Sequence, residues 1–306
     1  MGAWASGLYS GDFAMDLRGT IGALLRLPFE IDRIVEMVCE AERRAATDPQ
    51  NEDHTVFWLV LADQFVKRGI VNSGVRDRAL AIIDDGSDLA MHSRLGIDPA
   101  GLKKRGKMLA ELRARLAAPP PSNAKERSVL KHPQPFLMDI GDCFAYPTSG
   151  INCINSYYPS KEKIPGWKHD GWGAAVVIDR GRAFDFLTWY RALAIARPFA
   201  EKPSDAALFS GGPWVLKRPG TCSPVHFKRL ELERIARIEI DRETLARAFP
   251  EMKPGLSAAI SDISIANALG MMKEEPPAPE GPGKPVRGMY GTRILTIARL
   301  AEITGG

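Results

Sequence analysis

The sequence predicts an α+β protein of two domains: an all-helical N-terminal domain, then a C-terminal domain with a small, mostly antiparallel β-sheet or barrel plus helices. Three observations predict this class. Apolar residues recur at helical spacing up to residue 118. Residues 119–135 carry five prolines and predict a semi-rigid linker, because proline favours extended backbone. From residue 136 onwards, β-branched and aromatic residues alternate as they do in strands. We therefore expect domains over 1–118 and 136–306.

The N-terminal domain is expected to contain four or five helices. Apolar residues from Ile31 to Val38 recur at the spacing of one helix face. Residues 53–69 are apolar nearly all round, which predicts a central helix with Gly69 at its C-terminal cap. Residues 75–86 repeat the amphipathic pattern. Asp98 and Pro99 then provide an N-cap and a first-turn proline for a last helix that carries four leucines.

The C-terminal domain is expected to contain four strands: one around Phe144 and Tyr146, and three that end at Asp179, Tyr190 and Asp241. The sequence Asp-Arg-Gly at 179–181 predicts a hairpin turn between the second and third strands. Helices are expected over 242–248 and 256–269. A proline-rich loop near 275–285 separates these from a short C-terminal segment, 292–303.

Composition favours a folded protein in the cytoplasm. The chain is 45% hydrophobic and 25% charged, near the globular average. It has no apolar run of the roughly 20 residues that cross a bilayer and no secretory signal pattern, so we expect no membrane partner. The four cysteines form no Cys-x-x-Cys pair and have no histidine at ligand spacing, which favours reduced, buried thiols. We therefore expect no metal and no cofactor.

Charge argues against nucleic acid as the main partner. The first 118 residues carry 16 Lys and Arg against 17 Asp and Glu, and the remaining residues carry 25 against 20. A dedicated nucleic-acid-binding domain usually has a denser basic face. Weak nucleic-acid binding through the C-terminal domain stays as an alternative.

The opening stretch MGAWASG, followed by Asp12, Phe13 and Asp16, resembles the start of a family of uncharacterised bacterial helical domains that begin Met-Gly-x-Trp-x-x-Gly. Two further blocks, at 59–69 and 75–89, also resemble that family, although Ala5 stands where the family has glycine. The resemblance covers about the first 118 residues and implies no activity. Trp4 would anchor the opening loop to the helices, and the alternative is that this loop binds a ligand.

The stretches FLMDIGDCFAYPTSG and GWGAAVVIDRGRAFDFLTWYRA in the C-terminal domain resemble the immunity proteins of bacterial polymorphic toxin systems, whose first strand reads Gly-Asp-x-Phe-Ala-x-Pro. The resemblance covers about 60 residues. This chain departs from the pattern by an insert over residues 151–170 and by a C-terminal segment that the pattern lacks. The resemblance implies that the protein binds and neutralises a toxin without doing chemistry itself.

Two segments are candidates for partner binding. The insert combines aromatic and basic side chains, as interface hot spots do, although its aromatics could instead pack within the loop. The stretch 218–229 could bind a phosphate or carboxylate, although a turn and a short polar sheet edge is the preferred interpretation. The candidate residues are Tyr157, Tyr158, Trp167, Lys168 and His169 in the insert, and His226, Lys228 and Arg229 in the second segment.

A cysteine-dependent hydrolase or transferase is the enzymatic alternative. Cys143 could act with His169 or His226 and an acidic residue such as Asp142 or Asp185. However, Cys143 lies in an apolar strand, where a packed thiol is more common than a reactive thiolate.

The sequence therefore favours a binding protein over an enzyme, and the resemblance implies an immunity-type antidote with no catalytic residues. Its partner would be a protein, and the resemblance implies a toxin. The helical domain would assist binding or mediate formation of a homo-oligomer.

Overall fold

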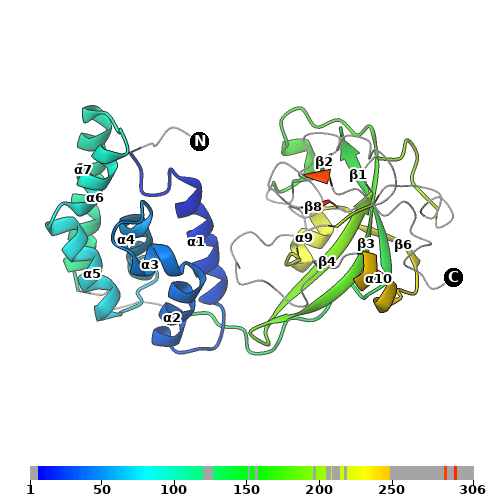
Figure 1. Ribbon diagram of the computed structural model, residues 1–306, viewed down its shortest axis with the longest axis horizontal. Helices are drawn as coiled ribbons and strands as arrows, with labels where there is room; N and C mark the ends of the chain where they lie inside the picture. Colours follow the sequence, from blue (N-terminus) through cyan, green and yellow to red (C-terminus); the bar gives the residue numbers. More distant parts are fainter. Residues whose placement is uncertain are drawn as a thin grey trace. The chain divides into compact units, whose positions relative to one another are not determined.

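The computed structural model describes residues 6–119, 127–150, 152–155, 158–195, 198–204, 208, 214–216 and 219–248, and the two short strands 286–287 and 293–294. The described residues form two compact units that divide between Lys131 and His132. The first unit is helical, and the second is a curled antiparallel sheet with short helices (Figure 1). This architecture confirms the predicted fold class.

Seven helices lie in the described part of the first unit, against the four or five expected. The two shortest, α3 and α6, account for the difference, because five and eight residues are too few to show a clear apolar period. The helices are α1 (Asp12–Leu24), α2 (Ile31–Ala41), α3 (Arg43–Thr47), α4 (His54–Val66), α5 (Ser73–Asp84), α6 (Ser87–Arg94) and α7 (Pro99–Ala117).

Helix α4 is the centre of the helical unit, as its all-round apolar sequence predicts. Residues 55–65 are all buried, and the helix contacts α1, α3, α5, α6 and α7. The chain leaves α4 through Gly69, whose φ of 66° suits glycine. Helix α7 begins as predicted, since the Asp98 carboxylate accepts a hydrogen bond from the Gly101 amide at 2.6 Å and Pro99 occupies the first turn.

A buried ion pair joins α6 to α7. The Arg105 guanidinium donates to both carboxylate oxygens of Asp88, at 2.6 and 2.9 Å, and neither side chain is accessible to solvent. The hydroxyl of Thr55 donates to the same carboxylate at 3.0 Å, and Nδ1 of His92 lies 2.9 Å from the Asp88 carbonyl oxygen. These bonds satisfy a charge pair that would otherwise be costly to bury.

The opening stretch is bound to the helices through polar contacts. The Tyr9 hydroxyl donates to the carboxylate of Asp63 on α4, and Arg105 donates to the carbonyl oxygen of Gly7 at 3.4 Å. Asp63 is buried and also lies 2.7 Å from Lys67 Nζ and 2.8 Å from Arg115 Nη1. Trp4 lies outside the described residues, so its predicted anchoring role stays a prediction.

Some described residues of the expected linker are hydrogen-bonded to one unit or the other. The Arg127 guanidinium donates to the carbonyl oxygens of Leu25, Leu27 and Phe29 at the end of α1. In the second unit, the Gln134 amide donates to the Phe186 carbonyl oxygen at 2.9 Å. The linker residue Arg127 is therefore bonded to the helical unit, and Gln134 is bonded to the sheet unit.

The second unit is built on a six-stranded antiparallel sheet with strand order β2-β1-β3-β4-β5, in which β6 also pairs with β1. The strands are β1 (Asp142–Ser149), β2 (Asn152–Cys153), β3 (Gly171–Ala183), β4 (Leu187–Ile195), β5 (Trp214–Leu216) and β6 (Glu233–Arg237). Helix α10 (Arg242–Ala248) agrees with its predicted range, whereas β6 ends four residues before the predicted limit at Asp241.

The prediction of a hairpin turn at 179–181 is wrong. Strand β3 continues through these residues, and the turn is formed by residues 184–186, where Phe184 and Asp185 have φ of 52° and 63°. Gly181 is needed for a different reason. A Cβ there would lie 2.7 Å from the Trp189 ring on β4, so this glycine allows close strand packing instead of a turn.

The sheet is covered on both faces. One face carries Phe144, Tyr146 and Tyr190, and it packs against Phe136 and against Phe227 of helix α9 (Pro224–Arg229). The other face carries the buried residues Cys143, Val176, Leu193 and Trp214, which share an apolar cluster with Leu245 of α10. Alternation along β1 thus divides its neighbouring residues between two separate apolar clusters.

The remaining C-terminal predictions fall largely outside the described residues. This applies to the expected helix over 256–269 and the proline-rich loop near 275–285. Within the expected segment 292–303, β8 (Arg293–Ile294) pairs antiparallel with β7 (Val286–Arg287). Among the helices described, none has the length and apolarity needed to cross a bilayer.

We expect substitution of Asp88→Asn to lower the free energy of unfolding by about 3–5 kcal/mol, because it leaves the Arg105 charge buried without its partner. The matched control is Asp84→Asn, which removes an exposed partner of Arg113 held at a similar 2.6 Å. Urea unfolding followed by circular dichroism at 222 nm measures both. Equal shifts for the two variants would contradict a special role for the buried pair.

Stability should fall on acidification because of His92. Burial, and then the charge of Arg105, lowers the pKa of His92 in the folded protein. Near and below pH 6.5 the unfolded chain therefore binds more protons than the folded chain, so the free energy of unfolding decreases as the pH falls. Urea midpoints between pH 7.5 and 5.5 should fall less for His92→Gln than for the unsubstituted protein. Parallel pH profiles would be the contrary result.

Candidate functional site

The insert between β1 and β3 is held at its base by hydrogen bonds. Strand β2 turns back on β1 through Gly150, whose φ is 63°. The Asp170 carboxylate accepts a bond from the Gly150 amide at 2.5 Å, and the Asp170 amide donates to the Thr148 carbonyl oxygen at 3.1 Å. The Lys168 amide donates to the Ser149 hydroxyl at 3.1 Å. Both ends of the insert are thus fixed to the end of β1.

Within the insert, the candidate side chains differ in exposure. The Tyr158 side chain is 37% exposed, and Lys168 and His169 are exposed. Trp167 is half-buried, and its indole Nε1 is buried with no hydrogen-bond partner in the described structure. Tyr157 lies outside the described residues. The insert therefore presents Tyr158 and basic groups to solvent.

The second candidate segment, 218–229, contains part of the sheet edge that the sequence suggested, because Gly220 forms an antiparallel bridge with Tyr190 of β4. Its second half, which was not expected to be helical, is helix α9. In α9, the Ser223 hydroxyl accepts a hydrogen bond from the His226 amide at 3.1 Å, and Pro224 occupies the first turn. The Phe227 ring packs edge-on against Phe144 at a centroid distance of 5.7 Å, which seats the helix on the sheet.

The polar residues of α9 lie near the surface. Lys228 is exposed, while His226 and Arg229 are half-buried. Burial, and then the nearby Arg229, lowers the pKa of His226, so its imidazole is neutral at physiological pH. Val225, on the first turn of the helix, is 54% exposed and adds an apolar contact point.

Two chains of contacts join the insert to residues 231–233, which follow α9. In the first, Lys161 Nζ in the insert lies 2.9 Å from a carboxylate oxygen of Glu231. In the second, the His169 ring packs edge-on against Trp172 at 5.2 Å, Lys202 Nζ lies over the Trp172 ring at 5.6 Å, and Lys202 pairs with Glu233.

The structure therefore links the insert to residues that directly follow the second candidate segment, about 60 residues further along the chain. We call this region the insert–α9 surface and define it as residues 158–172, Lys202 and 224–233. Sequence reasoning missed Lys202, Glu231 and Glu233, because ion pairs between distant segments leave no local signal in the sequence.

Cys143 is poorly placed for catalysis. Its thiol is fully buried, its Sγ lies 3.5 Å from the Gly141 carbonyl oxygen, and burial with the adjacent Asp142 raises its pKa to about 12. It packs on the sheet face opposite the one that holds Phe144 and α9, which carries His226. Asp142 is bound to Arg234 at 2.9 Å, and Asp185 lies in the β3–β4 turn. These positions disfavour the cysteine-dependent alternative.

No group of three or more potential metal ligands occurs among the residues that the structure describes. Comparisons with known protein families, curated protein sequences and solved structures found no match to this chain. The two family resemblances therefore rest on the sequence motifs alone, and the site is argued from its own geometry.

We expect the buried thiols of the folded protein to resist iodoacetamide. With a pKa of about 12, Cys143 holds roughly a thousandth or less of the thiolate that an ordinary cysteine holds at pH 7.5. Intact-mass and peptide mass spectrometry should find Cys143 and Cys222 unmodified in the folded protein and alkylated in guanidinium. Rapid alkylation of folded Cys143 would revive the enzymatic alternative.

Proposed function

We propose that the protein is an immunity-type binding protein whose sheet unit holds a partner protein, a toxin, at the insert–α9 surface. The observation that carries this proposal is the pair of contact chains from the insert to residues 231–233, through Lys161–Glu231 and through Trp172, Lys202 and Glu233. They hold exposed aromatic, apolar and basic side chains in one region.

The composition of this surface supports a protein partner. Tyrosine, tryptophan and arginine dominate binding energy at protein interfaces, and the surface offers Tyr158, Trp167 and Arg229. Tyr158 and Val225 are exposed, so burial against a partner would remove apolar area from water.

The anchoring of the insert also supports binding. Hydrogen bonds from Asp170 and Lys168 fix its C-terminal end, and the ion pair to Glu231 holds its middle. A loop ordered before association loses less conformational entropy when the partner arrives. The toxin as partner comes from the motif resemblance in β1 and β3.

The test begins with a tagged pull-down from the native host, in which the bound protein is identified, purified and titrated by calorimetry. We expect Tyr158→Ala and Trp167→Ala each to weaken binding by tenfold or more, as hot-spot truncations do. The matched control is Phe184→Ala, an aromatic residue with the same 37% exposure but located in the β3–β4 turn.

Circular dichroism should show that all three variants fold. Unchanged affinity for Tyr158→Ala and Trp167→Ala would show that the insert does not contribute to partner binding. Equal losses for all three variants would show that the effect is not specific to this surface. A bound toxin whose activity the protein does not reduce would refute the antidote role.

A further inference from the structure

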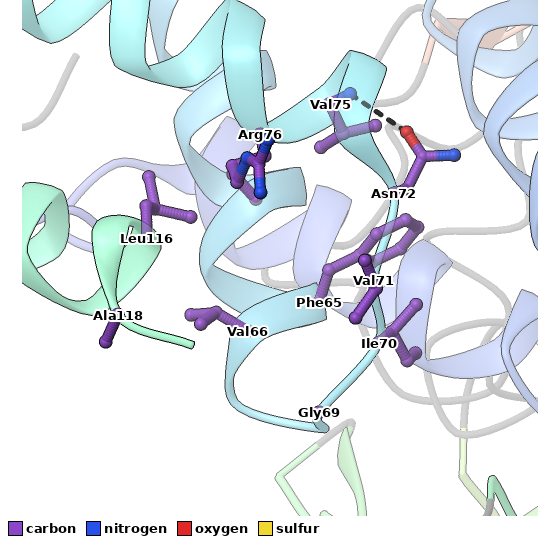
Figure 2. A pocket seen from close by; sticks show the side chains of 11 residues that line it. Phe65, Val66, Gly69, Ile70, Val71, Asn72, Val75, Arg76, Leu116 and Ala118 are labelled. Atoms are coloured by element: carbon purple, nitrogen blue, oxygen red, sulfur yellow. Dashed lines mark hydrogen bonds between the residues drawn. The ribbon is translucent and has the colours of Figure 1, made fainter. Parts of the chain in front are cut away.

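The helical unit contains an apolar pocket that the proposed function does not use. The pocket is a partly open hollow with about 500 Å³ of empty space, a volume that includes open solvent. Figure 2 shows Leu116 and Ala118 at one end of it and Ile70 and Val71 at the other, with Val66 between them. An apolar lining with a polar group at its edge is typical of sites for small molecules.

The chain geometry at the end of α4 creates this pocket. Gly69 turns the chain, the Ile70 amide bonds back to the Phe65 carbonyl oxygen at 2.9 Å, and Asn72 caps α5 by accepting from the Val75 amide. The short loop between them is thereby fixed, and it leaves the Val71 side chain 63% exposed beside the pocket. An apolar ligand would cover this side chain.

A guanidinium lies at the edge of the pocket. Nε of Arg76 is 3.0 Å from the Asp77 carboxylate, in a pair with both side chains about half exposed or more, and its other two nitrogens have no partner among the described residues. Exposed pairs of this kind contribute little free energy. Arg76 can therefore bind a second carboxylate through two parallel N–H bonds.

The other charged groups next to the lining residues are bonded to partners of their own. The buried carboxylate of Asp63 is shared by Lys67 and Arg115, and Arg68 is bonded to the neutral Gln64. The third carboxylate near the pocket, Asp32, accepts a bond from Asn72 at 2.8 Å. Asp63 and Asp32 are thus bonded to groups other than Arg76.

We propose that this pocket binds a small carboxylic acid with an apolar chain. The chain would lie against Phe65, Ile70, Val71 and Leu116, and the carboxylate would pair with Arg76. Burial of the apolar chain supplies the affinity, and the guanidinium selects the charged head group. This inference concerns the helical unit, so it stands or falls independently of partner binding by the sheet unit.

The probe is sodium octanoate, used below the concentration at which it forms micelles and titrated into the full chain by calorimetry and by amide chemical-shift mapping. We expect saturable binding of one equivalent, with shifts concentrated in residues 62–76. Arg76→Gln and Val71→Glu should each weaken octanoate binding about tenfold or more, because one removes the charged partner and the other adds a repelling carboxylate.

Arg44→Gln is the matched control, since Arg44 is exposed on α3 and does not line the pocket. It should leave the affinity unchanged. The neutral analogue 1-octanol should bind more weakly than octanoate and should be insensitive to Arg76→Gln. Absence of saturable binding, equal affinities for Arg76→Gln and Arg44→Gln, or shifts centred outside residues 62–76 would each overturn the proposal.

Discussion

The alternation of side chains along β1 is the constraint on which the sheet unit depends. Adjacent residues point to opposite faces, so Phe144 packs beneath α9 while Cys143 enters the cluster with Val176 and Trp214. Because both faces are covered, the described residues of β1 that could do chemistry are enclosed. Exposed polar side chains are found instead on strand β6, such as Arg234, and where the chain leaves the sheet.

The insert is the main departure of this kind. It leaves β1 through the turn at Gly150 and returns to β3 at Gly171, where a Cβ would lie 2.9 Å from the Phe199 carbonyl oxygen. Trp172, the next residue, makes hydrogen bonds to Phe199 in both directions. The return of the insert is thus built into the sheet, and residues 198–202 come with it. This explains how Lys202 reaches the surface that the insert forms.

Local signals could be read from the sequence where one short segment determines its own structure. The apolar run of α4 and the cap at Asp98 and Pro99 are of this kind, and both predictions are confirmed. The prediction of a turn at Asp-Arg-Gly was wrong because Gly181 lies within a strand, where the absence of a side chain makes room for the Trp189 ring on the neighbouring strand. The local sequence around Gly181 does not reveal this contact.

Helix α9 is the converse case: a helix is present where the sequence did not predict one. Its cap signal, Ser223 followed by Pro224, is present in the sequence, but six residues are too short for an apolar period to support it. The candidate residues of the insert and of α9 could be picked by residue type. Their placement in one region depends on Lys161 and Glu231, which lie 70 residues apart, and no pattern in a single sequence joins such a pair.

The charges of the insert–α9 surface help to separate a protein partner from a nucleic acid. Six basic side chains lie there with four acidic ones: Lys161, Lys163, Lys168, Lys202, Lys228 and Arg229 against Glu162, Asp170, Glu231 and Glu233. Two of the lysines, Lys161 and Lys202, are held in ion pairs with Glu231 and Glu233. A phosphate backbone would have to compete with these carboxylates for the same ammonium groups and would be repelled by them.

A protein partner faces no such conflict. Its own mixed charges can meet both signs, and the modest positive excess favours approach by an acidic surface. The ion pairs then serve to hold the loop in place, while Tyr158 and Val225 supply apolar area for burial. The same carboxylates that weaken the case for nucleic acid therefore strengthen the case for a protein, because they order the surface before the partner binds.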